Sequence, residues 1–152
     1  MENSFIRPVN LKEIDGSFDL LMKFNKEIKI YDTEEKMRTT IEKFFELGNP
    51  IGIIKDGEVI AYFNLYCNNT ETLEAYLGNL YVLEKYRRQG IARALVNEAF
   101  QFTQNRGFEK VVLHVGKDNI PAIKLYEECG FKKTGATKII ANEDTYEMKK
   151  VL

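Results

Sequence analysis

The feature that most constrains the fold is a run in the middle of the chain that is apolar on both faces. Residues 77–82 read Leu-Gly-Asn-Leu-Tyr-Val, without the regular polar alternation of a strand that faces water on one side. A strand of this kind is buried on both faces, so other elements must cover both sides of its sheet. Gly78 inside the run indicates a β-bulge or a close approach of another backbone. We therefore predict a covered central strand over residues 73–83.

The residues on either side of this strand alternate between helical and strand patterns. Apolar spacing and capping residues predict helices over residues 11–25, 33–47, 91–106 and 119–129. β-rich runs predict strands over residues 5–9, on both sides of an Asp56-Gly57 turn within 50–67, and over 110–115, 131–140 and 145–152. The turn between the last two strands is expected at residues 142–144. This order predicts a single mixed α/β (α+β) domain over residues 1–152.

Charge and composition argue against several classes of function. The chain has 152 residues and a formal net charge of −1, so nothing global favours nucleic acid or an anionic membrane as a partner. Cys67 and Cys129 lack CxxC spacing and accompany a single histidine, which argues against a disulfide framework or a metal site. The N-terminal residues lack a basic and then apolar leader, and no long apolar run follows. We expect a cytoplasmic protein without a metal ion.

The central strand leads into a glycine-containing loop and then a helix, in the stretch Tyr86–Leu95, YRRQGIARAL. The N-terminus of a helix presents unpaired backbone N–H groups at a positive dipole end, which is a physical site for phosphate. Gly90 lets the backbone approach an anion, and Ala92 keeps the first turn slim. Neither GxxxxGK[ST] nor GxGxxG is present, which argues against a P-loop or a Rossmann dinucleotide site. On this loop alone, an ordinary left-handed turn followed by a basic helix start explains the pattern as well.

Two motifs together carry a family resemblance. Arg87-x-x-Gly90-x-Ala92 fits the pattern [QR]-x-x-G-x-[GA]. Residues 119–131 fit N-x-x-A-x-x-L-Y-x-x-x-G-F at every keyed position, and one predicted helix and one predicted strand separate the two motifs. In this order the motifs resemble those of the GNAT superfamily of acetyl-coenzyme-A-dependent N-acetyltransferases, whose order of elements also matches nearly the whole chain.

The resemblance implies both a fold and a co-substrate. The fold is a single GNAT-like domain with a mixed, mostly antiparallel sheet of about six to seven strands, splayed central strands and about four helices. The co-substrate is acetyl-CoA: strand backbone pairs with its pantetheine arm, N–H groups at the helix start hold its pyrophosphate, and Asn119 contacts the arm or caps the helix. The implied cofactor-binding residues are Leu80, Val82, Arg87, Arg88, Gln89, Gly90, Ile91, Ala92 and Asn119.

The resemblance assigns the general acid to Tyr126, which would protonate the departing thiolate. A thiol pKa of about 8.5 and a phenol pKa of about 10 place full transfer about 2 kcal/mol uphill. We therefore expect a lowered phenol pKa, or a hydrogen bond that only stabilises the developing charge. The alternative is that Tyr126 is a helix-face aromatic packed on the core.

The general base is harder to assign. Glu74 is the only carboxylate within the central strand, and its alternative is a solvated surface position. Asn79 stands where many relatives carry an acid near the bulge, which favours a water-mediated proton path or a base outside the motifs. His114 has a suitable ordinary pKa, but a lone strand histidine is expected to pack. Cys129 is expected to be a small buried side chain rather than an acyl carrier.

The predicted activity is transfer of an acetyl group to a primary amine of a small molecule or peptide. In the family, the first two helices, their loop at about residues 25–32 and the final strand pair form the acceptor site, and dimers are common, so a homodimer is one expectation. The rival hypothesis is a non-catalytic acyl-CoA-binding module of the same fold. A nucleic-acid-binding regulator is disfavoured by the net charge.

Overall fold

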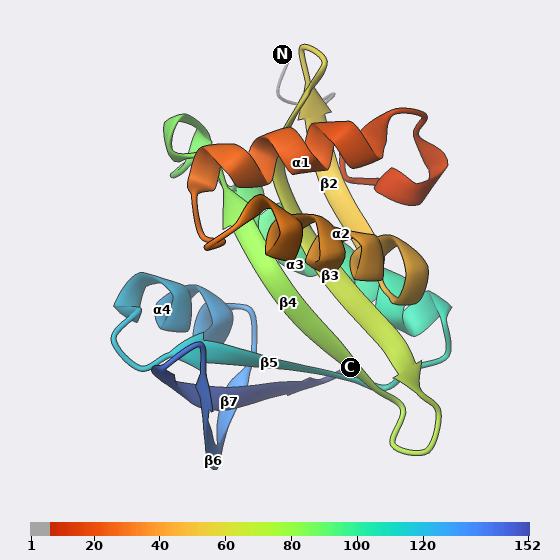
Figure 1. The fold of residues 1–152 in the computed structure, drawn as a ribbon. Coiled ribbons are helices and arrows are strands. Elements are labelled where there is room, and N and C mark those ends of the chain that lie inside the picture. Colours follow the sequence, from red (N-terminus) through yellow and green to blue (C-terminus); the bar gives the residue numbers. More distant parts are fainter. Residues whose placement is uncertain (1–6) are drawn as a thin grey trace. The chain divides into compact units, whose positions relative to one another are not determined.

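The computed structural model describes residues 7–152, in which four α-helices and seven strands form (Figure 1). The helices are α1 (Ser17–Ile28), α2 (Glu34–Leu47), α3 (Ile91–Asn105) and α4 (Ile120–Glu128), with short 3-10 turns η2 (Leu11–Glu13) and η3 (Glu84–Tyr86). The strands are β1 (Val9–Asn10), β2 (Asn49–Lys55), β3 (Glu58–Asn69), β4 (Glu74–Val82), β5 (Lys110–Gly116), β6 (Lys132–Ile140) and β7 (Glu143–Val151). Part of the strand predicted at residues 5–9 lies outside the described residues.

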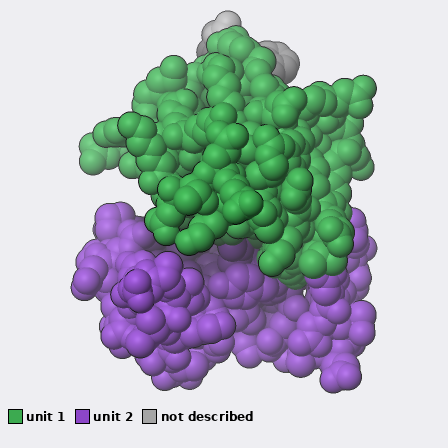
Figure 2. All heavy atoms as spheres, in the orientation of Figure 1, with its two compact units in different colours: residues 1–66, 79–95 green, residues 67–78, 96–152 purple. Residues whose placement is uncertain are grey.

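The strands follow the order β1-β2-β3-β4-β5-β7-β6. The β4–β5 pair is parallel, whereas the β1–β2, β2–β3, β5–β7 and β6–β7 pairs are antiparallel. This mixed, mostly antiparallel sheet confirms the predicted fold class. The chain divides into two compact units, residues 1–66 with 79–95 and residues 67–78 with 96–152 (Figure 2). The division falls within β3, within β4 and within α3.

The first unit packs two helices on a hairpin. Helices α1 and α2 lie over one face of β2 and β3 (Figure 1). The β2–β3 turn is the predicted Asp56-Gly57 pair, whose φ angles of 52° and 78° are the positive values that a two-residue hairpin turn requires. The fully buried apolar side chains of the first unit include Leu11, Leu21, Ile41, Ile51, Ile53, Ile60, Ala61, Tyr62, Phe63, Leu65 and Leu95.

The first helix starts later in the chain than the apolar pattern predicts. Residues 11–13 form only a 3-10 turn, in which the N–H of Lys12 donates to the Asn10 side chain. Gly16 has a φ of 77° and precedes α1, which then runs to Ile28 instead of stopping at residue 25. A left-handed residue cannot continue a right-handed helix, so Gly16 divides the apolar pattern into two elements.

The second unit is built around β5, which lies between β4 and β7. Its β6–β7 turn is Ala141-Asn142, with φ angles of 50° and 65°, instead of the expected residues 142–144. Glu143 is already paired with Ile140, so it belongs to the strand. The buried apolar side chains of this unit include Ala75, Val96, Ala99, Val111, Leu113, Val115, Phe131 and Met148.

Candidate active site

The loop that precedes α3, residues 87–90, has the geometry of an anion site. The first helical hydrogen bond runs from the N–H of Ala94 to the carbonyl of Gly90 at 3.0 Å, so the N–H groups of Ile91 and Ala92 precede the helical ladder. Gly90 has a φ of 80°, and a Cβ added to it would meet no atom within 4 Å. The backbone here is therefore open to a close ligand, at the positive end of α3.

Arg87 holds this loop against the end of β4. Its Nε donates to the carbonyl of Val82 at 3.0 Å, and its own N–H donates to the carbonyl of Glu84 at 3.1 Å. The guanidinium of Arg87 therefore stabilises the conformation of the loop. Arg88 is exposed and has a left-handed backbone conformation, with a φ of 63°. Of the predicted pantetheine contacts, Leu80 is half-buried and Val82 is buried, and both lie in β4 just before the loop.

The bulge predicted near Gly78 falls at the next residue. Asn79 has a φ of 57°, a left-handed conformation in the interior of β4. The parallel β4–β5 ladder covers only Glu74–Tyr76 and Lys110–Val112. Beyond it, β5 continues to Gly116 in register with β7. A ladder that ends before the bulge is the backbone arrangement expected of splayed central strands.

The second motif lies on β5–α4 of the second unit. Asn119 caps α4, because its Oδ1 accepts from the N–H of Ala122 at 3.3 Å, and the residue is exposed. Tyr126 is 9% exposed, and its ring meets that of Phe131 edge-on with centroids 5.6 Å apart. The capping and packing roles considered for these two residues are thus both present, and neither conflicts with a contact to a ligand.

Glu74, the predicted base, is held in an ion pair. Its Oε2 accepts from Nζ of Lys149 at 2.7 Å, and the hydrogen bond to Glu74 raises the pKa of that lysine. Glu74 is the first residue of β4, five positions before Asn79, which is roughly 16 Å along an extended strand. The structure therefore places this carboxylate at the strand's start and against a lysine.

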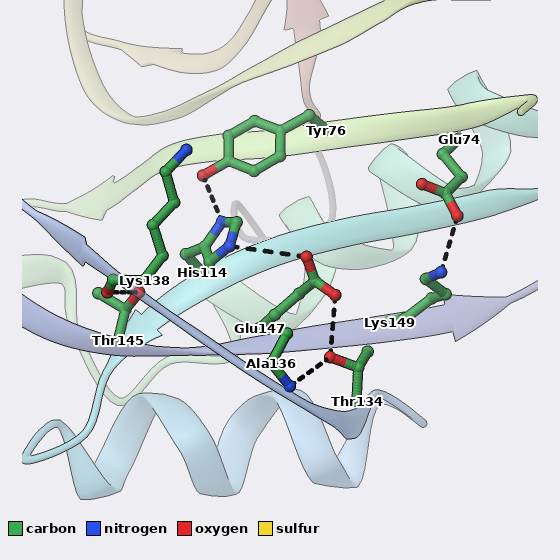
Figure 3. Close-up of polar contacts among 9 residues, drawn as sticks. All are labelled: Glu74, Tyr76, His114, Thr134, Ala136, Lys138, Thr145, Glu147 and Lys149. Atoms are coloured by element: carbon green, nitrogen blue, oxygen red, sulfur yellow. Dashed lines mark hydrogen bonds and ion pairs between the residues drawn. The ribbon is translucent and has the colours of Figure 1, made fainter.

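Sequence reasoning missed a chain of polar contacts that begins at Tyr76 (Figure 3). The Tyr76 hydroxyl lies 3.1 Å from Nδ1 of His114, and Nε2 of His114 lies 3.7 Å from Oε2 of Glu147. The hydroxyl of Thr134 donates to the other oxygen of Glu147 at 2.9 Å. His114 was expected to pack, and it is indeed mostly buried, but both of its nitrogens face polar groups. Only strand register brings these residues together, and their spacing in the sequence carries no signal of it.

Burial shifts the pKa values of His114 and Tyr76 in this chain of contacts. Loss of solvent lowers the pKa of His114, with Lys138 acting in the same direction and Glu147 opposing it. Burial also raises the pKa of Tyr76, as does the charge of Glu147. At neutral pH the imidazole is therefore neutral and the phenol carries its proton, and the tautomer of His114 decides which of the two groups donates in the contact between Tyr76 and Nδ1.

A surface pocket lies where the acceptor loop was expected, between the end of α1 and the start of α2. Its lining residues are Asn25, Lys26, Lys29, Tyr31, Asp32, Thr33, Glu34 and Met37. Burial raises the pKa of Tyr31 to about 12. Lys36 pairs with Asp32 at 3.4 Å and Lys26 pairs with Glu34 at 3.3 Å, so lysines offset the acidic charge here.

The described part of the chain holds neither a metal cluster nor a helix that could span a membrane. Within residues 7–152, no group of three or more histidine, cysteine, aspartate or glutamate side chains is placed to hold a metal ion. No helix in that range is long and apolar enough to cross a membrane.

Comparison with known proteins places these features in a family. The Acetyltransferase (GNAT) family matches residues 18–131, a range that includes both motifs. Human N-acetyltransferase 8 is 46% identical over 59 residues, which are 39% of this chain and 26% of that protein. N-alpha-acetyltransferase 30 of Schizosaccharomyces pombe is 38% identical over 60 residues, 40% of each chain. The chain thus spans well under half the length of these relatives.

Solved structures share the fold over almost the whole chain. The ribosomal-protein-S18-alanine N-acetyltransferase of Escherichia coli has a TM-score of 0.77 at 21% identity, covering 96% of this chain and 93% of that one. Arabidopsis thaliana NAA60, in complex with a bisubstrate analogue, has a TM-score of 0.72 at 22% identity, covering 96% of both chains. Because the family match spans most of the sequence, the chain belongs to the GNAT acetyltransferase family.

Proposed function

We propose that this chain is an N-acetyltransferase that moves an acetyl group from acetyl-CoA to a primary amine of a small molecule or peptide. The observation that carries the proposal is the family match over residues 18–131, which contains both the loop before α3 and Tyr126. The relatives support an amine acceptor, since the E. coli protein is named for an alanine of a ribosomal protein and another similar structure is a spermidine N-acetyltransferase chimera.

The loop before α3 fits the diphosphate of acetyl-CoA. Backbone N–H groups from Arg88 through Ala92 would bind the oxygens of the diphosphate, where Gly90 has open space and the dipole of α3 favours negative charge. Main-chain groups of β4 near Leu80 would pair with the pantetheine amides, as the bulge at Asn79 separates this end of the strand from the short β4–β5 ladder.

The chemical step needs proton transfer at both ends. The amine nitrogen attacks the thioester carbonyl, the C–S bond breaks, and we assign protonation of the departing thiolate to the Tyr126 hydroxyl. An acceptor amine with a pKa of about 10.4 is neutral in only about one molecule in 2,500 at pH 7, a cost of about 4.6 kcal/mol. The site must therefore deprotonate the ammonium, or use amines of lower pKa.

The rival function is a binding module that takes up acyl-CoA without turnover. The ion pair between Glu74 and Lys149 favours it, because the strand carboxylate that could serve as base is neutralised by a lysine. Both functions predict the same response to the co-substrate, and they differ only in turnover.

Two measurements on the purified chain test the proposal. Acetyl-CoA should raise the melting temperature, since a ligand that binds only the folded state stabilises it by mass action. A panel of amines, polyamines, amino acids and peptides should then release free thiol from acetyl-CoA. Absence of the thermal shift would refute acetyl-CoA binding altogether. A shift without thiol release from any acceptor would select the binding module.

A further inference from the structure

The pocket between the end of α1 and the start of α2 has an excess of positive charge. Asp32 and Glu34 line it, but Nζ of Lys36 lies 3.4 Å from Asp32 and Nζ of Lys26 lies 3.3 Å from Glu34, so a lysine offsets each carboxylate. Lys29 also lines the pocket, and no carboxylate among the described residues lies within ion-pair distance of it. The pocket therefore presents one unpaired ammonium group to a ligand.

The other polar groups of the pocket add no negative charge to it. The amide of Asn25 is already bonded, because its Oδ1 accepts from the Tyr62 hydroxyl at 3.2 Å and its Nδ2 donates to a carbonyl within α1 at 2.9 Å. Burial raises the pKa of Tyr31 to about 12, so this phenol is neutral at physiological pH. The carboxylate of Glu27 lies in a separate surface depression, together with Lys23. The charge of Lys29 is therefore the one that a ligand of this pocket meets.

Two side-chain contacts link this pocket to the end of β4. Asn25 of the pocket accepts from the hydroxyl of Tyr62 on β3, and the ring of Tyr62 lies 6.3 Å from the ring of Tyr81, centroid to centroid. Tyr81 follows Leu80 in β4, where the pantetheine arm of acetyl-CoA is proposed to pair. All four residues belong to the first unit. A molecule in the pocket therefore lies within reach of the bound co-substrate.

The acid–base chemistry of the acceptor favours a peptide N-terminus. The α-amino group of a peptide has a pKa of about 7.7 to 8.0, so roughly one molecule in ten is neutral at pH 7, compared with about one in 2,500 for a lysine-like amine. The carboxylate of Glu74 is held by Lys149, 2.7 Å away, and is not free to deprotonate an ammonium. A peptide N-terminus therefore needs less help from a base than a polyamine does.

We propose that the acceptor is the N-terminus of a peptide with an acidic side chain among its first two residues, and that the ammonium group of Lys29 binds this carboxylate. The inference rests on the proposed N-acetyltransferase function and names the substrate class of its acceptor. The pocket volume of about 360 Å³ lies in the range of ligand sites and can admit such a side chain. The same lysine disfavours a polyamine, which carries only positive charges.

The deciding experiment compares kcat/KM for N-terminal acetylation of three amidated tripeptides, Glu-Ala-Ala, Gln-Ala-Ala and Arg-Ala-Ala. A second series places the same three residues at the second position of the peptide. In one series or both, the wild type should prefer the glutamate peptide to the glutamine peptide about three- to fivefold, and the glutamine peptide to the arginine peptide by a similar factor, as expected for one exposed charge contact. Lys29→Gln should reduce these ratios to about one. Lys29→Glu should invert the order, so that the arginine peptide becomes the best acceptor.

Lys43→Glu is the matched control, because Lys43 is an exposed lysine of α2 that does not line the pocket. It changes the net charge of the chain as Lys29→Glu does, and it should retain the wild-type order of acceptors. Acetyl-CoA should raise the melting temperature of all three variants as it does that of the wild type, since the diphosphate site is unchanged. Salt should weaken the wild-type preference, because a Debye length of about 3 Å at 1 M screens an exposed charge pair.

The inverted order of acceptors excludes a merely structural role for Lys29, which would change stability or kcat without reversing a preference. Equal kcat/KM within both peptide series of the wild type, or the wild-type order in Lys29→Glu, would overturn selection by this lysine while the acetyltransferase function stands. Acetylation of spermidine in preference to every peptide would overturn it as well. No thiol release by the wild type with any amine would overturn both proposals.

Discussion

The loop before α3 and a polar stripe on the second unit both consist of polar groups, but they use different parts of the chain. The stripe is made of the ion pair Glu74–Lys149 and the chain of contacts Tyr76–His114–Glu147–Thr134. The diphosphate site proposed for the loop consists of backbone N–H groups of consecutive residues, and Gly90 supplies the left-handed turn and the open space. The stripe consists of side chains from four strands, which are far apart in sequence and aligned by register. The proposed backbone site should therefore tolerate side-chain changes that leave its glycine intact, whereas each contact of the stripe depends on its own side chains.

The largest effect is expected for Gly90→Asp, which tests the proposed diphosphate site in the loop before α3. The new carboxylate would project into the open space above the loop and repel a diphosphate, so acetyl-CoA affinity should fall at least about 100-fold, on the order of 2.7 kcal/mol. The thermal shift measures it. Gly107→Asp is the matched control, because Gly107 has a φ of 79°, close to the 80° of Gly90, and equally open surroundings. The control carries the same backbone strain. Equal loss of acetyl-CoA binding in both variants would therefore contradict a diphosphate site in the loop before α3.

The next largest effect is expected for Tyr126→Phe, a change on α4 outside the stripe. The ring contact with Phe131 is kept, so the variant should still fold. Loss of the hydroxyl should lower kcat about 10- to 100-fold with an unchanged thermal shift by acetyl-CoA, because phenylalanine cannot protonate the thiolate. Unchanged kcat would mean that Tyr126 only packs on the core and is not the general acid.

A smaller effect is expected at Glu74, the carboxylate that the sequence favours as general base. Both side chains of the Glu74–Lys149 pair are about a third exposed, so Glu74→Gln should cost less than about 1 kcal/mol in the free energy of unfolding. Because the lysine holds this carboxylate at the start of β4, we expect thiol release to stay within about twofold of wild type. A drop in kcat of about 100-fold would make Glu74 the base instead.

The smallest effect is on stability as a function of pH. The folded state lowers the pKa of His114, so the unfolded chain binds a proton more readily than the native one. The free energy of unfolding should therefore fall as pH decreases below about 6.5, by less than about 1.4 kcal/mol per pH unit, the limit for one group. Urea titrations at several pH values measure this slope. His114→Gln should remove its contribution, and an unaltered slope would show that the histidine is not buried as the structure has it.

The two regions also differ in how far sequence predicts them. The loop, the cap at Asn119 and the hairpin at Asp56-Gly57 depend on local residue type, and each was predicted in place. The bulge was predicted to within one residue, because Gly78 marked it while Asn79 adopts it. The predicted start of α1 was wrong, because the apolar periodicity continues across Gly16 although the helical backbone does not.

The stripe could not be predicted in the same way. His114 was expected to pack and is mostly buried, but nothing in the spacing shows that Tyr76 and Glu147 are its neighbours. Parallel pairing of β4 with β5 and antiparallel pairing of β5 with β7 determine that, and register depends on packing of the whole unit. Glu74 was favoured as the base for its place in the strand. Its ion pair with Lys149 could not be predicted, because it too depends on strand register.

The most direct test of the account is the stoichiometry of transfer. The purified chain is incubated with acetyl-CoA and an amine that it accepts, and free thiol and acetylated amine are quantified in the same reaction, the latter by mass spectrometry. The account predicts one mole of N-acetylated amine for each mole of thiol released, with both rates falling together in Tyr126→Phe. Thiol released without acetylated amine, or no thiol at all with any acceptor, would contradict it.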